Sequence, residues 1–290
     1  MTHRPRPRLS QHFLQDRGVI ARIVQAVDPR PGEVIVEIGP GLGAITAPLV
    51  QRAEQLHVVE IDSELVAVLQ QRFAGETRLH VHLGDALSYD ITSLISGTER
   101  LRVVGNLPYH ISTPLLFHLF TQSAVIQDMH LMLQRELARR VVAPPGSRTY
   151  GRLSVMTQLR CQVEKLFDIR PGAFHPVPKV SSTLLRLIPR CQLPAPIKDL
   201  AAFEQLVARV FSQRRKTLRN SLKPWLSDEQ IRAAQVDPAL RPEMLTLLQF
   251  AALANQLRPE SLRSSFKNVA SAGRARRTVA TKSSGTILNS

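Results

Sequence analysis

The stretch "EVIVEIGPGLG", residues 33–43, places an apolar run directly before three glycines spaced Gly-x-Gly-x-Gly. The run is typical of a buried strand, and glycines just past a strand let the backbone turn tightly and approach a ligand closely. The spacing differs from the Gly-x-Gly-x-x-Gly of dinucleotide-binding proteins, and no Lys-Ser or Lys-Thr follows to bind a triphosphate. The loop therefore predicts a ligand-binding turn, but its spacing does not identify the ligand.

Similar apolar runs follow along the chain, with helical sequence between them, at residues 56–62, 79–85, 101–106 and 129–134. Strands that alternate with helices of about 10–15 residues indicate βαβ units, and hence an α/β fold with a mostly parallel sheet covered on both faces. Two further runs, 161–169 and 182–188, are expected to extend the sheet with an antiparallel edge. Pro48 predicts that the helix after the glycine loop is kinked or begins late.

Three parts are predicted along the chain: an α/β domain over residues 1–192, a small all-helical domain over 193–262, and a basic tail over 263–290. The tail is rich in Ser, Ala, Thr and Gly without helical periodicity, so it is expected to be disordered. It is either a solubilising extension or a weak nucleic-acid-binding arm.

The chain is strongly basic, with 38 Lys and Arg against 23 acidic residues and a formal net charge of +15. This balance favours a large anionic partner, nucleic acid before membrane. No apolar run approaches the roughly 20 residues that span a bilayer, and the first ten residues lack the apolar core of a signal peptide, so a cytoplasmic protein is expected. Cys161 and Cys191 lack metal-ligand spacing, and no metal is expected.

Acidic residues end the second and third predicted strands. Glu60 lies 21 residues after Gly39, a position from which a carboxylate accepts both hydroxyls of a ribose, and Asp85 is placed to meet an adenine amine. A single acidic residue after a strand is usually a helix cap. With the glycine loop, however, these residues form a series after three successive strands. The series favours an adenosine-bearing ligand without a phosphate chain, and S-adenosylmethionine is the common cofactor of that description.

The fourth strand ends in "NLPY", residues 106–109. Asn and Pro are ordinary turn residues, so a simple turn is one reading. The other is a site: the Asn106 amide oxygen and the Leu107 carbonyl, whose direction Pro108 restricts, are two acceptors for the two N–H bonds of an exocyclic amine. Tyr109 offers a flat ring on which a base can stack. The second reading predicts methylation of an amine that is conjugated into a ring.

Longer motifs extend this pattern: "SQHFLQD" at 10–16, "GNLPYHISTPLLFHL" at 105–119, "YGRLSVM" at 150–156, "AFHPVPKVSS" at 173–182 and "FSQRRKTLRNSL" at 211–222. Over about residues 8–257 the sequence resembles the ribosomal RNA adenine dimethyltransferase family, in particular its bacterial small-subunit members. The resemblance implies a Rossmann-like fold that uses S-adenosylmethionine to dimethylate two adjacent adenines. It places them in the 3′-terminal hairpin loop of 16S rRNA, within the small ribosomal subunit, during late ribosome assembly.

The resemblance and the glycine loop together assign the cofactor contacts to His12, Leu14, Gly39, Gly41, Glu60, Asp85 and Asn106. The residues expected to hold the target base are Asn106, Leu107, Pro108, Tyr109 and Phe174, the two aromatic rings enclosing the base. Taken alone, His12 would be a surface histidine and Phe174 a core residue. Ser10 stands where the family often has glycine, and His110 where asparagine is frequent.

Predicted RNA contacts lie in residues 203–225. Apolar positions Val207, Phe211, Leu218 and Leu222 fall on one helical stripe, and Arg215, Arg219 and Lys223 fall on a neighbouring one. A charge run is usually a solvated face, but unpaired like charges repel each other and are relieved when phosphates neutralise them. Arg214 is expected either to extend past the apolar side or to face a cleft. The predicted RNA-binding set is Arg214, Arg215, Lys216, Arg219 and Lys223.

Rival functions remain at this point: methylation of 23S rRNA or of DNA adenine, or a non-catalytic RNA-binding assembly factor on a methyltransferase scaffold. The "QRRKTLRNSL" segment favours the small-subunit substrate. The presence of Asn106, Tyr109, Glu60 and Asp85 argues against lost catalysis. A monomer is expected.

Overall fold

The computed structural model describes residues 11–97, 99–108 and 111–258. The chain separates into two compact units. Among the described residues, the first holds those up to Pro144 together with Leu153–Gln192, and the second holds Pro145–Arg152 and those from Leu193 to 258. The sequence assigned residues 145–152 to the first domain, whereas in the structure they belong with the second unit.

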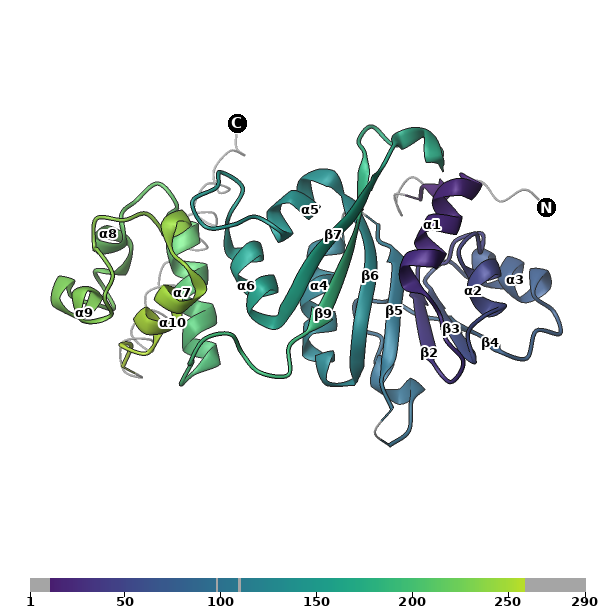
Figure 1. Cartoon of the computed structure of the whole chain (residues 1–290), viewed down its shortest axis with the longest axis horizontal. Coiled ribbons are helices and arrows are strands. Elements are labelled where there is room, and N and C mark those ends of the chain that lie inside the picture. Colours follow the sequence, from purple (N-terminus) through teal and green to yellow (C-terminus); the bar gives the residue numbers. More distant parts are fainter. Residues whose placement is uncertain (1–10, 98, 109–110, 259–290) are drawn as a thin grey trace, which may run out of the picture. The chain divides into compact units, whose positions relative to one another are not determined.

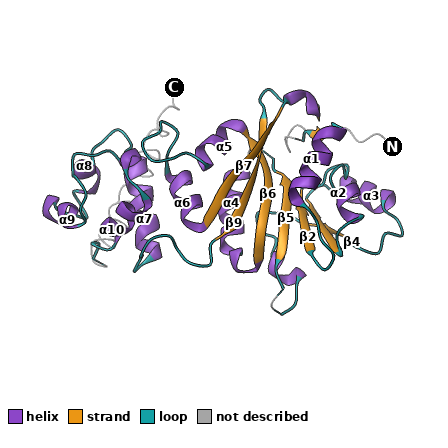
Figure 2. Cartoon of the chain, in the orientation of Figure 1, coloured by secondary structure: helices purple, strands orange, loops and turns teal. Residues whose placement is uncertain are grey.

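A seven-stranded sheet forms the first unit (Figures 1 and 2). Its order is β4-β3-β2-β5-β6-β9-β7. Strands β2(Val34–Ile38), β3(Gln55–Glu60), β4(Leu79–Leu83), β5(Leu101–Asn106) and β6(Ile126–Gln134) run parallel, whereas β9(Ser182–Pro189) and β7(Cys161–Ile169) run antiparallel. The predicted α/β fold and its antiparallel edge are confirmed. The strand order reverses between β2 and β5, which is where sheets of this kind bind ligands.

Helices cover both faces of the sheet. Helices α1(Arg17–Val27), α2(Thr46–Val50) and α3(Ser63–Arg72) bury apolar side chains on one face. Helices α4(Ser112–Thr121), α5(Arg135–Val141) and α6(Arg152–Arg160) do so on the other. Helix α2 begins late, at Thr46, so that Pro48 falls within its first turn, as its sequence predicted. Short 3-10 turns η2(Ile91–Leu94), η3(Ser123–Val125) and η4(Pro171–Ala173) connect the elements.

A second, two-stranded sheet joins β1(Phe13–Leu14) to β8(Phe174–His175), with Leu14 opposite Phe174. The sequence did not predict it, because two residues are too few to show an alternating pattern. This pairing brings the segment at 11–16 against the loop that follows η4. The backbone N–H of Gln15 also donates to the carbonyl of Ala173 at 2.8 Å.

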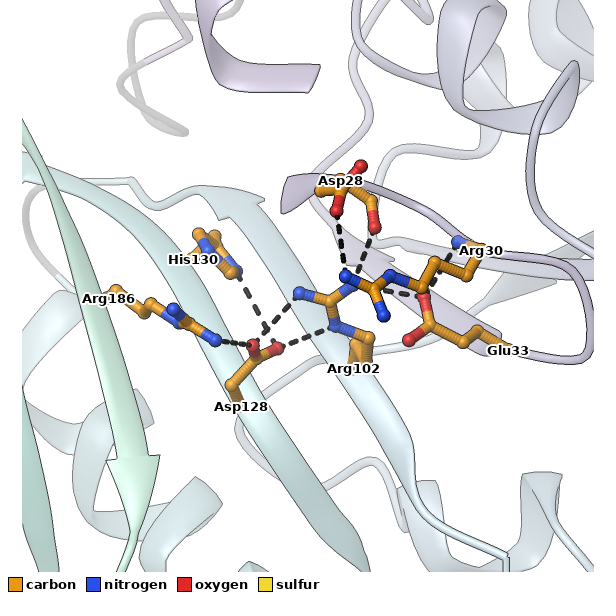
Figure 3. A network of polar contacts seen from close by, with 7 residues as sticks. All are labelled: Asp28, Arg30, Glu33, Arg102, Asp128, His130 and Arg186. Carbon is orange, nitrogen blue, oxygen red and sulfur yellow. Dashed lines mark hydrogen bonds and ion pairs between the residues drawn. The ribbon is translucent and has the colours of Figure 1, made fainter. Parts of the chain in front are cut away.

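Buried charges lie at the amino ends of the central strands (Figure 3). Arg102 on β5 donates from Nε and Nη2 to both carboxylate oxygens of Asp128 on β6, at 2.8 and 2.9 Å. Its Nη1 donates to Glu33 at 3.0 Å, and Arg186 on β9 donates to Asp128 at 3.1 Å. His130 is fully buried beside this network, and burial lowers its pKa to about 4. The network therefore links three adjacent strands at the end opposite the ligand site.

The second unit contains only helices among its described residues, as predicted. They are α7(Leu200–Ser212), α8(Leu218–Leu222), α9(Asp228–Ala233), η5(Pro242–Met244) and α10(Leu247–Ala254). Aromatic rings form its core: Phe250 contacts both Phe203 and Phe211, and Phe211 contacts Tyr150. Tyr150 explains why residues 145–152 belong here.

The prediction of continuous helical stripes within residues 203–225 is wrong. Helix α7 ends at Ser212, and a new helix begins at Leu218. The first backbone N–H groups of α8 donate to a distant loop instead of an earlier turn: Leu218 to Leu240 and Arg219 to Pro238. Arg215, Arg219 and Lys223 therefore do not lie along one helix.

Among the described residues, no helix has both the length and the apolar composition to cross a membrane. The predictions on the tail and on Ser10, Tyr109 and His110 fall outside the described residues.

Candidate active site

A cavity of about 280 Å³ lies at the carboxyl ends of the parallel strands, at the switch in strand order. Segments after β2, β3, β4 and β5 line it, together with residues 11–15 from the amino-terminal segment. It brings together most of the predicted site: His12, Leu14, Gly39, Gly41, Glu60, Asp85, Asn106, Leu107 and Pro108.

The glycine loop wraps closely around this cavity. Gly41 has a φ of +57°, and a Cβ there would lie 2.9 Å from the Phe13 ring. Its backbone N–H donates to Glu60 at 3.3 Å. A side chain at this position would both strain the backbone and displace Phe13, which explains the glycine.

Glu60, at the end of β3, is a buried carboxylate of the site and is 6 % exposed. Its oxygens accept from the backbone N–H groups of Gly41 at 3.3 Å and Asp62 at 3.0 Å. Burial raises its pKa, and these hydrogen bonds oppose that rise. The backbone N–H of Ile61 is a further donor to this carboxylate, which has about four acceptor positions, so acceptor capacity remains for a hydroxyl of a sugar.

Asp85 also lines the cavity but is exposed. Its Oδ1 accepts from the backbone N–H of Leu87 at 2.9 Å, so it stabilises its own turn. The turn-capping role that single acidic residues usually have is therefore present, alongside a position at the cavity wall.

Asn106 ends β5 with its side chain held in one orientation. Its Nδ2 donates to the backbone carbonyl of His12 at 3.0 Å. Among the described residues nothing donates to its Oδ1, which is left to accept from a ligand. The His12 ring in turn contacts the carbonyl of Pro176, Nδ1 to O, at 2.7 Å. The β1 segment thus links Asn106 to the loop after β8.

The structure does not bring Phe174, one of the two rings expected to enclose the target base, to the cavity. Phe174 is 3 % exposed, packs in the apolar core beside Leu14 and Ile23, and does not line the cavity. The loop was expected to present this ring to a base, whereas the β1–β8 pairing turns it into the core. Its contact with a target base stays a prediction.

Glu37 is a cavity residue to which the sequence analysis gave no role. It lies on β2 immediately before the glycine loop, is 2 % exposed, and accepts from the Thr46 hydroxyl at 2.6 Å. Its place before the glycines was visible in the sequence. That it is buried, and faces the cavity, depends on tertiary packing.

The predicted RNA-binding residues lie in the second unit and differ in their surroundings. Arg219 pairs with Asp228 at 2.7 Å, and Arg214 contacts Glu243 at 3.9 Å and the carbonyl of Arg148. Arg219 is therefore not the unpaired charge that the sequence predicted. Arg215, Lys216 and Lys223 are exposed and form no ion pair with the described residues.

The described residues contain no group of three or more His, Cys, Asp or Glu arranged to hold a metal ion. The cavity does fit S-adenosylmethionine: glycines of the loop after β2 line it with bare backbone, and Glu60 is a buried acceptor for ribose hydroxyls. The doubly wound sheet and this cavity together define a Rossmann-like, S-adenosylmethionine-dependent methyltransferase.

Comparisons with known proteins give the family. Residues 2–258 match the family model described as ribosomal RNA adenine dimethylase. The chain is 52 % identical over 255 residues to ribosomal RNA small subunit methyltransferase A of Pseudomonas aeruginosa, covering 88 % of this chain and 95 % of that protein. It is 52 % identical over 254 residues to the protein of the same name from Laribacter hongkongensis, covering 88 % and 96 %.

Two solved structures share the fold over most of the chain. A dimethyladenosine transferase from Plasmodium falciparum superposes with a TM-score of 0.69 at 25 % identity, covering 83 % of this chain and 96 % of that one. The 23S rRNA methyltransferase ErmE superposes with a TM-score of 0.67 at 28 % identity, covering 84 % and 99 %. The chain belongs to the ribosomal RNA adenine dimethylase family and is an enzyme that methylates adenine in ribosomal RNA.

Proposed function

We propose that the protein dimethylates two adjacent adenines in the 3′-terminal hairpin loop of 16S rRNA, within the small ribosomal subunit, as a monomer in the cytoplasm. The observation that carries the chemistry is the fixed Asn106 amide, with its Nδ2 donating to His12 and its Oδ1 left as an acceptor. Relatives about half identical over most of the chain are named for the small ribosomal subunit, which supports this substrate.

In the proposed reaction, Asn106 Oδ1 and the Leu107 carbonyl accept the two N–H bonds of the adenine amine. This draws the nitrogen lone pair out of conjugation with the ring, so that it can attack a methyl group. S-adenosylmethionine supplies that methyl group on a positively charged sulfur. The methylated nitrogen is a strong acid and loses its proton without a base having acted beforehand. Glu60 and Asp85 hold the adenosine part of the cofactor, and Tyr109 and Phe174 hold the target base.

Among the predicted RNA-binding residues, the best candidates to contact phosphates are Arg215, Lys216 and Lys223. These cations are exposed and lack ion pairs with described residues, so neutralisation by phosphate costs them no existing contact. Arg219 would first have to leave Asp228. We therefore propose that the first three residues contribute more to RNA affinity than Arg219.

The substrate is tested by incubating the protein with labelled S-adenosylmethionine and three alternatives: small subunits lacking the methylations, large subunits, and duplex DNA. Primer-extension stops at two adjacent adenines near the 3′ end of 16S rRNA are expected. Stops in 23S rRNA, or label in DNA, would replace the proposed substrate. No label in any of them, together with retained RNA binding, would support the assembly factor instead.

A further inference from the structure

Glu37 is a buried acid that no cation among the described residues balances. It lies on β2, is 2 % exposed, and lines the cavity. One oxygen accepts from the Thr46 hydroxyl at 2.6 Å. Among the described residues, no Lys, Arg or His pairs with the carboxyl, and nothing donates to its second oxygen.

The surroundings of Glu37 on each side are apolar or acidic. Its register partners are Val58 on β3 and Val104 on β5. The charged group that acts on it is Glu60, which is also an acid. Burial chiefly, and Glu60 in addition, raise the pKa of Glu37 to about 7, while the Thr46 hydroxyl opposes the rise. Without ligand the carboxyl therefore carries a proton for much of the time near neutral pH.

An acid in such a place is unfavourable for the empty fold, because an apolar side chain of similar size would fill the space without losing hydration. A positively charged ligand reverses this balance, because a cation favours the ionised form of a nearby carboxyl. S-adenosylmethionine carries two positive groups, the sulfonium and the amino group. Its demethylated product keeps only the amino group.

We propose that Glu37 is the buried counter-charge for the cationic part of the cofactor, and that it releases a proton when that part binds. The inference rests on the proposed function, since it takes S-adenosylmethionine as the ligand. The proton passes from the carboxyl to the solvent, and the ionised carboxylate stays with the cation. Glu37 thereby makes cofactor affinity depend on pH.

The test is isothermal titration calorimetry of the full-length protein, in buffers of different ionisation enthalpy, to count the protons released on binding. Three ligands separate the contributions. S-adenosylmethionine has both cations, S-adenosylhomocysteine has one, and methylthioadenosine has the adenine and ribose but neither cation. Proton release on binding methylthioadenosine therefore measures only the contribution from Glu60 when it binds the ribose.

We expect S-adenosylmethionine to release more protons below about pH 7 than methylthioadenosine does. Its affinity is expected to fall by up to about tenfold per pH unit there and to be flat above that pH. S-adenosylhomocysteine identifies the cation. Release equal to that with S-adenosylmethionine assigns Glu37 to the amino group, and release equal to that with methylthioadenosine assigns it to the sulfonium.

Two variants make the assignment specific. Glu37→Gln is expected to remove the extra proton release and flatten the pH dependence, with binding of methylthioadenosine kept. Thr46→Val removes the hydrogen bond that favours ionisation, so the midpoint of the pH dependence is expected to move upward. Circular dichroism checks that both variants fold.

The outcomes separate this inference from the proposed function. If none of the three ligands binds the wild-type protein, the proposed function fails. If all bind, but proton release is equal for S-adenosylmethionine and methylthioadenosine or survives in Glu37→Gln, only the counter-charge role fails. If Glu37→Gln does not fold, an unmoved midpoint in Thr46→Val overturns the inference.

Discussion

Replacing Asp128 by Asn tests how much the buried charge network contributes to the first unit. Asp128 is 1 % exposed, and its two oxygens accept from Arg102 at 2.8 and 2.9 Å and from Arg186 at 3.1 Å. Asn would replace one acceptor with an N–H donor that faces another donor. Arg102, itself 5 % exposed, would keep Glu33 as its carboxylate partner. Breaking a buried pair from one side costs about 3–5 kcal/mol, which we expect here.

Urea denaturation followed by far-ultraviolet circular dichroism measures this cost as a change in the free energy of unfolding. In a thermal melt it corresponds to a lowering of about 6–20 °C for a unit of this size. The matched control is Asp28→Asn, which removes an exposed pair with Arg30 and keeps a residue type that tolerates its φ of 48°. A loss for Asp128→Asn no larger than that of the control would refute the reasoning.

Three further outcomes are expected. Asn106→Ala is expected to lower the rate of methyl transfer by about 10²–10³-fold while the circular dichroism spectrum is kept, with Gln70→Ala as an exposed control; full activity would contradict the amide's role. His130 is neutral in the fold, with a pKa of about 4 against about 6.5 unfolded. Stability is therefore expected to be complete above pH about 6.5 and to fall by about 3 kcal/mol as the pH drops to about 4, and His130→Leu should reduce this loss in urea titrations at each pH. Arg215→Ala with Lys216→Ala is expected to weaken RNA binding and reduce its salt slope by about 0.7 per lost phosphate contact, and to do so more than Arg219→Ala, measured by filter binding at several salt concentrations.

The sheet could be predicted because its strands are local signals. The apolar runs at 33–39, 56–62, 101–106 and 129–134 each coincide with a largely buried strand of the structure, since continuous apolar runs are what buried parallel strands require. The run at 79–85 coincides with the edge strand β4, which is only partly buried. The location of the ligand site could be predicted from the same runs, because the carboxyl ends of parallel strands all lie at one edge of the sheet. The β1–β8 pairing and the break before Leu218 depend on contacts between residues far apart in sequence, and no local pattern encodes them.

The candidate site shows the same division. Glu60 and Asn106 end their strands, and Gly41 lies in the loop just after β2, so their positions could be predicted from the sequence. The burial, hydrogen bonds and side-chain orientations of these residues could not be predicted. Glu60 is buried and bonded to backbone N–H groups, and the Asn106 amide is oriented by the carbonyl of a residue 94 positions earlier. Phe174 was expected to enclose the target base and lies in the core, because a two-residue strand pairing decides which way it faces.

The buried network and the catalytic edge occupy opposite ends of the same two strands, and strand register connects them. The pairing of β5 with β6 is irregular between Leu101 and Arg102: Leu101 lies opposite Ile126, and Arg102 opposite Asp128. From there the register runs unbroken to Asn106 opposite Met132. A shift of one residue would turn Asn106 to the other face of the sheet. Apolar contacts alone specify register weakly along β5, because five of its six residues are buried whichever face they take. A fixed pair of opposite charges favours one alignment of β5 on β6. We therefore expect Arg102 and Asp128 to help place Asn106 at the cavity, even though burying them adds little net stability.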